Sequence, residues 1–170
     1  MSEVHAFPSI PTRILLPIDF SSSSQAALEM AGGLAKHFHA ELHLVHVIPK
    51  FPTSTLADFV SETKVLEGAR SVAERHLVKC QAALAARGVK STFNVAVGND
   101  IAGEIMEEAE RESIDMVVIS THGISGWHPL VFGSIAEKVV KIVQCPLLLL
   151  RSAKPDASGK SPAGRSTEWW

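Results

Sequence analysis

The sequence has few cysteines and no long hydrophobic run, and these two absences exclude several classes of protein. Cys80 and Cys145 are too few for a disulfide framework, so we expect reduced thiols that pack as small hydrophobic side chains. The longest apolar run, residues 146–150, is far shorter than the roughly 20 residues that span a membrane. The first residues show no cationic region followed by an apolar core, so we expect no secretory signal and a cytoplasmic location.

The chain also lacks a strong excess of charge of either sign. Its 16 Lys and Arg residues face 18 Asp and Glu residues, which gives a net charge of -2. A protein that binds a nucleic-acid backbone usually carries a basic surface, so we expect no nucleic-acid partner. The length of 170 residues and the 46% hydrophobic content are those of one globular domain.

The pattern of the chain changes near both ends. Residues 1–12 contain two prolines and no periodic pattern, which predicts a short N-terminal arm. Residues 152–170 are rich in Ser, Lys, Pro, Gly and Ala, which predicts a flexible tail. We therefore expect the folded domain to comprise residues 13–151.

Apolar segments and helical patterns alternate along this domain. The apolar segments predict five strands, at residues 13–18, 41–48, 92–97, 115–119 and 147–151. Helical periodicity predicts helices over residues 22–38, 57–86, 101–109 and from 134 onward. The S-x-x-Q and S-x-x-E patterns predict N-caps at Ser22 and Ser134, and Gly88 fits the position just after the second helix. The alternation is typical of an α/β fold with a parallel sheet.

The expected topology places a ligand site at one edge of the sheet. Right-handed crossovers with helices on both faces favour a single doubly wound, five-stranded sheet in the order 3-2-1-4-5. Such sheets bind ligands at the carboxyl ends of the strands where the strand order reverses, here between strands one and four. Asp19 follows the first strand, and residues 120–123 follow the fourth. The fifth strand would form an exposed apolar edge, which predicts a homodimer that covers it.

Residues 120–134 hold the best candidate for an anion site. Gly123, Gly126 and Gly133 permit close approach of the backbone to a ligand. Gly133 and Ser134 open a helix, and the free N–H groups of a helix start suit a phosphate. Two structural alternatives stay open, because Ser134 is also an ordinary N-cap and Asp19 is also a typical cap for the helix that follows it.

Several stretches resemble the universal stress protein family of the UspA type over residues 13–151. They are RILLPIDFSSSSQAAL, LHLVHVIP, DMVVISTHG, FGSIAEKVV and CPLLLLR. The ATP-binding members of that family carry the motif G-x2-G-x9-G-S/T. Gly123, Gly133 and Ser134 match its second part, whereas Ser120 stands where the first glycine would be. The resemblance implies an adenine nucleotide alpha hydrolase-like fold and the same homodimer through the fifth strand.

The resemblance also implies roles for individual residues. Asp19 would face the ribose or the adenine, Val47 would offer backbone groups to the adenine, and Pro17 would belong to the pocket wall. The ribose and phosphates would be lined by Ser120, Gly123, Gly133 and Ser134. The implied ligand is ATP, or ADP or AMP, with Mg²⁺ on the phosphates left open.

Other chemistry has weaker support. His37, His39, His43 and His46 cluster in the sequence, but the last two fall on opposite faces of a strand, so we expect core or surface histidines and no metal site. No general base is paired with a nucleophile, so we expect no proficient enzyme. The sequence thus favours a stress-response regulatory or protective dimer that binds an adenine nucleotide. The alternatives are a dimeric interaction module of the same fold that binds no nucleotide, which Ser120 favours, and a slow nucleotide hydrolase.

Overall fold

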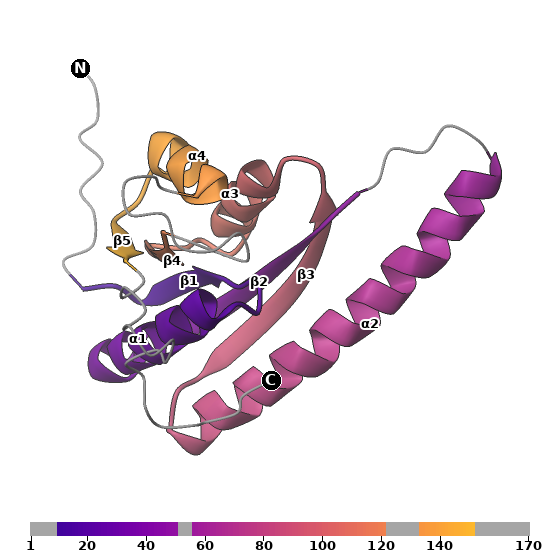
Figure 1. Ribbon diagram of the computed structural model, residues 1–170. Coiled ribbons are helices and arrows are strands. Elements are labelled where there is room, and N and C mark those ends of the chain that lie inside the picture. The colour runs from indigo at the N-terminus through magenta and orange to yellow at the C-terminus, as the bar shows by residue number, and fades with distance from the viewer. Residues whose placement is uncertain (1–9, 51–55, 122–132, 152–170) are drawn as a thin grey trace, which may run out of the picture.

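A computed structural model of the chain describes residues 10–50, 56–121 and 133–151, with the side chains of residues 56–61 excepted. Its centre is a five-stranded parallel sheet in the order β3-β2-β1-β4-β5, which confirms the predicted order (Figure 1). The strands are β1 (Arg13–Pro17), β2 (Glu41–Pro49), β3 (Ser91–Gly98), β4 (Met116–Ser120) and β5 (Leu147–Leu150). Residues 1–9 and the predicted tail, residues 152–170, lie outside the described residues.

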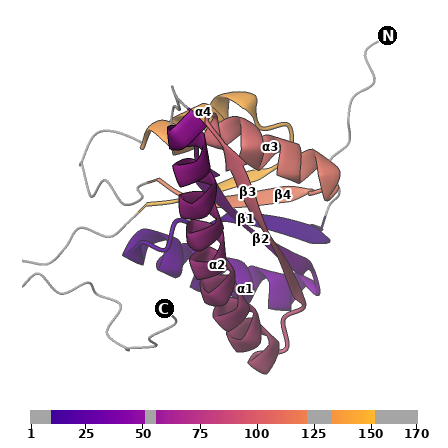
Figure 2. The ribbon, with the colours of Figure 1, turned by 90° about the vertical axis from the view of Figure 1, so that its right-hand side faces the viewer.

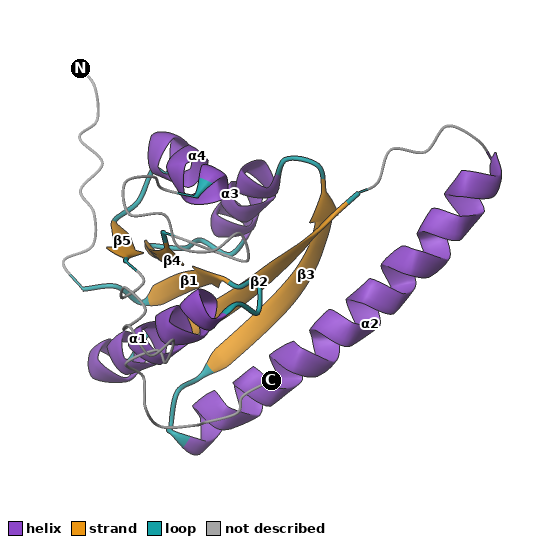
Figure 3. Ribbon diagram, in the orientation of Figure 1, coloured by secondary structure: helices purple, strands orange, loops and turns teal. Residues whose placement is uncertain are grey.

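Helices cover both faces of the sheet. On one face lie α1 (Ser22–Phe38) and α2 (Leu56–Ala86), and on the other lie α3 (Ile101–Arg111) and α4 (Ser134–Ile142) (Figures 1 and 3). The long helix α2 runs along β2 and β3 (Figure 2). Within the described residues, no helix combines the length and the apolar character needed to cross a membrane.

Two apolar layers form the core, one on each face of the sheet. Side chains alternate along each strand, so Leu16 and Leu44 pack toward α1 and α2, whereas Leu15 and Val45 pack toward α3 and α4. β1 is therefore covered on both faces, which accounts for its nearly continuous apolar sequence. Along α2, the residues that face this core are Ala73, Leu77, Cys80 and Leu84.

The predicted N-caps are each wrong by one residue. The N-cap of α1 is Ser21, whose hydroxyl accepts a hydrogen bond from the Ser24 N–H at 3.2 Å. The N-cap of α4 is Gly133, so Ser134 is the first helical residue. Glu137 does not close a capping box; its carboxylate pairs instead with Lys141 one turn later, at 2.7 Å.

The end of α2 follows the prediction. Gly88 has φ 76, in the left-handed region that glycine adopts without strain. The N–H of Val89 donates to the carbonyl of Leu84 at 3.0 Å, as in a Schellman motif. Gly88 therefore turns the chain out of α2 and into β3.

A buried polar network ties β2 and β3 to α3. The side chains of His43 and Glu108 are 5% and 1% exposed, and His43 Nε2 lies 2.5 Å from Glu108 Oε1. Asn94 donates to the other oxygen of Glu108 at 2.9 Å, and Arg111 donates to the same oxygen. Thr92 Oγ1 lies 2.7 Å from His43 Nδ1. A carboxylate only accepts hydrogen bonds, so His43 carries a proton on Nε2.

This network predicts a large cost for removing Glu108. We expect Glu108→Ala to lower the free energy of unfolding by about 3 kcal/mol, because the buried donor of His43 and the half-buried donor of Asn94 lose their acceptor. Urea unfolding at neutral pH measures the change. Glu107→Ala, at an exposed position on the same helix, should change it by less than about 0.5 kcal/mol. Equal effects of the two substitutions would contradict a stabilising role for the network.

Candidate functional site

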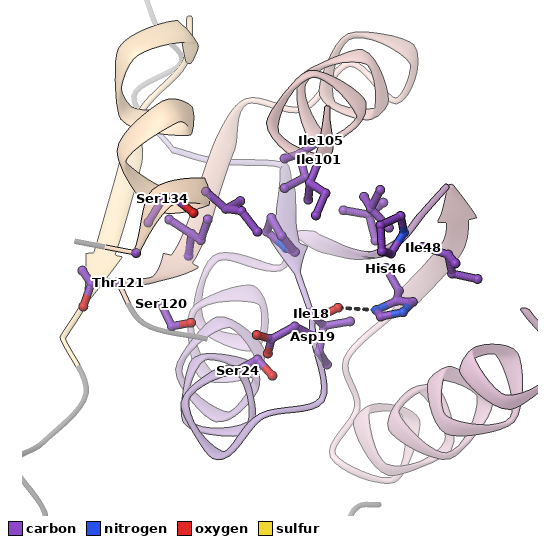
Figure 4. A pocket seen from close by; sticks show the side chains of 18 of the residues that line it. Ile18, Asp19, Ser24, His46, Ile48, Ile101, Ile105, Ser120, Thr121 and Ser134 are labelled. Atoms are coloured by element: carbon purple, nitrogen blue, oxygen red, sulfur yellow. Dashed lines mark hydrogen bonds between the residues drawn. The ribbon is translucent and has the colours of Figure 1, made fainter. Parts of the chain in front are cut away.

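The described residues enclose a pocket at the carboxyl ends of β1, β2 and β4. Its volume is about 580 Å³, within the range of sites for small molecules. It lies where the strand order reverses, which is the location that the topology predicts. Its walls come from the strand ends, from Ile101 and Ile105 of α3, and from the first turn of α4 (Figure 4).

The pocket brings together six of the seven site residues expected from the sequence. The six are Pro17, Asp19, Val47, Ser120, Gly133 and Ser134. Gly123 lies outside the described residues, as does the rest of the loop over residues 122–132. The individual roles of these residues toward a nucleotide stay predictions.

Asp19 lies in the turn between β1 and α1. Its Oδ1 accepts hydrogen bonds from the backbone N–H and the hydroxyl of Ser21, at 3.0 and 2.6 Å. Because Ser21 is the N-cap of α1, Asp19 holds the cap without being the cap itself. The structural and the functional roles considered for Asp19 are therefore compatible, since its carboxylate also lines the pocket.

His46 is a pocket residue that the sequence suggested only as an unlikely metal ligand. Its Nδ1–H donates to the carbonyl of Ile18 at 2.7 Å (Figure 4). Burial is the largest influence and lowers the pKa of His46 from its ordinary 6.5, while the Ile18 hydrogen bond and the charge of Asp19 partly oppose it. The ring is therefore uncharged at neutral pH. The sequence did contain a signal for this position: His46 is the neighbour of Val47 near the carboxyl end of a predicted strand, which is the edge where a ligand was expected.

Phe20 fixes the same turn from the other side. Its φ of 61 places it in the left-handed region, which is uncommon for a bulky residue and costs of order 1 kcal/mol. Its ring centroid lies 4.6 Å from that of His46 and 5.2 Å from that of His76 on α2. These ring contacts stabilise the strained turn that carries Asp19.

Val47 presents its backbone to the pocket because β2 extends past the end of β1. The last residue of β1 in register with β2 is Pro17, opposite Val45. The Val45 carbonyl accepts from the Ile18 N–H at 2.9 Å. Backbone groups of alternate residues point the same way, so those of Val47 also point toward β1, where no strand residue remains. An open pair of peptide groups at this place can bind a ligand that has both a donor and an acceptor.

The start of α4 forms another polar wall. Gly133 donates to the carbonyl of Thr121 at 2.7 Å, and no side chain caps the helix at Gly133. The Glu137 N–H donates back to Gly133 at 2.9 Å, so the N–H groups of residues 134–136 precede the first intrahelical bond. This end of the helix carries the positive end of the macrodipole and suits an anion.

Apart from these polar groups, the lining is mainly aliphatic. Asp19 and His46 are the titratable side chains among the described lining residues. Within the described residues, no group of three His, Cys, Asp or Glu side chains is arranged to hold a metal ion. The arrangement fits a flat apolar group with hydrogen-bonding edges that is joined to an anionic group.

Sequence comparison finds relatives over most of the chain. Residues 11–151 match the model of the universal stress protein family. Universal stress protein YxiE of Bacillus subtilis is 32% identical over 146 residues, which cover 82% of this chain and 98% of the relative. Universal stress protein MJ0531 of Methanocaldococcus jannaschii is 31% identical over 144 residues, which cover 85% of this chain and 84% of the relative.

Solved structures share the fold. Universal stress protein UspA from Lactobacillus plantarum aligns with a TM-score of 0.77 at 23% identity, over 85% of this chain and all of that chain. A universal stress protein in complex with cAMP aligns with a TM-score of 0.63 at 19% identity, over 85% of this chain and 100% of that chain. The universal stress protein from Archaeoglobus fulgidus in complex with dAMP aligns with a TM-score of 0.52 at 18% identity, over 81% of this chain and 96% of that chain. The fold is the adenine nucleotide alpha hydrolase-like fold.

The lowered pKa of His46 predicts a pH-dependent stability. The unfolded chain takes up a proton at this residue near pH 6.5, whereas the folded chain does so only at lower pH. The contribution of His46 to the unfolding free energy is therefore complete above pH 6.5 and is lost as the pH falls below it. Asparagine does not titrate and keeps an amide N–H for the Ile18 carbonyl.

We therefore expect His46→Asn to flatten the acid side of the stability profile, measured by thermal unfolding between about pH 5 and 8. His37→Asn, at an exposed position near the end of α1, should leave the wild-type profile unchanged. A wild-type slope in the His46 variant would contradict the assignment.

Proposed function

The chain belongs to the universal stress protein family, and from this premise we propose that it binds an adenine nucleotide in the pocket at the carboxyl ends of β1, β2 and β4. One observation carries the proposal: a carboxylate, an open strand edge and a helix start meet around one aliphatic cavity of about 580 Å³. Complexes of universal stress proteins with cAMP and dAMP support this choice of ligand.

In this proposal, the adenine, the ribose and the phosphate each contact a different part of the pocket lining. The adenine lies against the aliphatic side chains, with its edge toward the N–H and carbonyl of Val47. The hydroxyls of the ribose donate to the carboxylate of Asp19, which Ser21 holds in place. The phosphate accepts from the N–H groups at the start of α4, beside Gly133 and Ser134. Asp19 is the one carboxylate in the described lining, so any Mg²⁺ would be held mainly by the phosphates.

Ser120 departs from the glycine of the family motif, but the departure does not close the pocket. Ser120 is the last residue of β4 and lines the cavity. The volume of about 580 Å³ is present with the serine in place. We therefore propose that the serine is tolerated and that its hydroxyl lies within reach of the ribose or the phosphate.

Nucleotide binding would serve regulation or protection under stress, with any hydrolysis being slow. The described lining offers a carboxylate, a neutral imidazole and a helix start, which suit the binding of a nucleotide, and we propose that binding and not turnover is its main chemistry. A cytoplasmic location remains the expectation from the sequence.

Calorimetric titration with ATP and AMP tests the proposed site. We expect nucleotide-stripped protein to bind, and Gly133→Val to weaken binding at least about tenfold, because the new side chain blocks approach to the start of α4. With φ -59, valine fits this backbone without strain. Gly68→Val, at an exposed position with no heavy atom within 4 Å of an added Cβ, is the matched control and should keep wild-type affinity.

The same titration distinguishes a nucleotide-binding protein from a dimeric interaction module that binds no nucleotide. If both variants and the wild type stay folded and dimeric but bind no adenine nucleotide, the interaction module becomes the better reading, with Ser120 as its structural cause. Equal binding by wild type and Gly133→Val would place the phosphate elsewhere.

We further propose a homodimer through the outer edge of β5. The carbonyl of Pro146 accepts a hydrogen bond from the N–H of Val117 in β4 at 2.9 Å. The carbonyl of Leu150 accepts one from the N–H of Thr121, just after β4, at 2.8 Å. By alternation, the peptide groups of Leu147 and Leu149 point away from β4 toward the open edge. The four leucine side chains of this strand are only partly buried. A second β5 would satisfy the peptide groups and cover the side chains.

Leu149→Pro tests this interface most directly. It removes an N–H that faces the open edge while keeping the hydrogen bonds to β4. We expect the variant to be monomeric in size-exclusion chromatography with light scattering, whereas Leu149→Val should remain dimeric. A folded Leu149→Pro dimer would exclude this edge. Leu148→Asp is less selective, because Leu148 also packs against the core layer under α1 and α2.

A further inference from the structure

The charges around the pocket indicate which adenine nucleotide it takes. We propose that the pocket is built for a nucleotide with a single phosphate and does not use the second and third phosphates of ATP for binding. This inference rests on the proposed function and concerns the same site.

The described lining has no lysine or arginine, and its one carboxylate is negative. The other titratable lining group, His46, is uncharged at neutral pH, because burial lowers its pKa and its Nδ1–H is bound to the Ile18 carbonyl. The lining side chains therefore contribute a net negative charge from Asp19.

Cations near the pocket do not line it. Lys50 follows β2, Arg151 follows β5 and Lys138 lies on α4; all three are exposed and outside the lining. The sequence between residues 122 and 132 contains two histidines and no Lys, Arg, Asp or Glu. No side chain of that segment carries a permanent positive charge.

Among the described residues that line the pocket, the start of α4 is the main source of positive potential. A helix start is equivalent to roughly half an elementary charge and acts over about one turn. Glu137, in the first turn of α4, is exposed and opposes that potential in part, although Lys141 pairs with it at 2.7 Å. One phosphate monoester, with about 1.5 to 2 negative charges at pH 7, already exceeds the available compensation.

Each further phosphate adds negative charge to a lining that already contains Asp19. Repulsion from this carboxylate and loss of phosphate hydration then oppose the gain from new contacts. The two extra phosphates of ATP should contribute nothing favourable unless a divalent cation neutralises them.

Paired titrations with AMP and ATP in EDTA test the inference. We expect AMP to bind at least as tightly as ATP, and Mg²⁺ to improve ATP binding selectively. Tighter binding of ATP than of AMP in EDTA would overturn the inference and leave the proposed function standing. If neither nucleotide binds, the proposed function itself fails.

A charge-insertion pair sharpens the test. Ile135 lines the pocket and is 37% exposed, whereas Ile142 lies two turns later on α4, is 44% exposed and is outside the lining. We expect Ile135→Lys to raise the affinity for ATP about fivefold and for AMP by less, because the new cation supplies the missing compensation. Ile142→Lys should change neither affinity, which controls for net charge. A similar gain for both nucleotides from Ile135→Lys would contradict the inference.

Discussion

The early end of the central strand is the constraint on which the site depends. Proline has no N–H, and Pro17 is the last residue of β1. Ile18 makes one more hydrogen bond, to the Val45 carbonyl, and the chain then turns away through Asp19. On one side β2 continues four residues past Val45, the partner of Pro17, and ends at Pro49. On the other side β4 is no longer than β1 and ends at Ser120. The extension of β2 therefore leaves a gap beside the end of β1, and Ser120 and the start of α4 line the same pocket.

The turn after β1 connects the fold to the site. It contains Phe20 in a left-handed conformation, which an isolated chain would not favour. Contacts from β2 and α2, through His46 and His76, hold the Phe20 ring, and the Asp19 carboxylate holds the N-cap of α1. Because the same contacts pack the core and orient the carboxylate, a change in this cluster affects both stability and the pocket. Strain of this kind is retained where surrounding structure over-determines it.

Sequence patterns were sufficient for the strand order, because it depends on periodicity and on position along the chain. The family resemblance and the topology together named six residues that line one pocket, but their roles toward a nucleotide stay predictions. The N-cap of α1 was misplaced because serines occupy all four positions 21–24, so local pattern alone does not choose among them. The N-cap of α4 was misplaced because Gly133, which has no side chain to signal a cap, takes the position that the pattern gave to Ser134. Burial of Glu108 was not predictable from its amphipathic helix, since its partner His43 lies 65 residues away. Gly32 lies within α1, where glycine is an unfavourable helix residue, and its role also depends on a distant contact. An added Cβ would lie 3.0 Å from Leu84 on α2, so the glycine permits close helix packing.

Two histidines on β2 differ in role because their hydrogen-bond partners differ: one is a core residue and the other lines the pocket. His43 is buried, and Thr92 and Glu108 occupy its two ring nitrogens, so its environment is complete without a ligand. His46 lies three residues later on the opposite face, where a single backbone carbonyl fixes one nitrogen and the ring itself forms part of the pocket wall. The first histidine is thus committed to the packing of α3 against the sheet. The second lies between the turn after β1 and the pocket, because it donates to the Ile18 carbonyl and its ring lines the cavity.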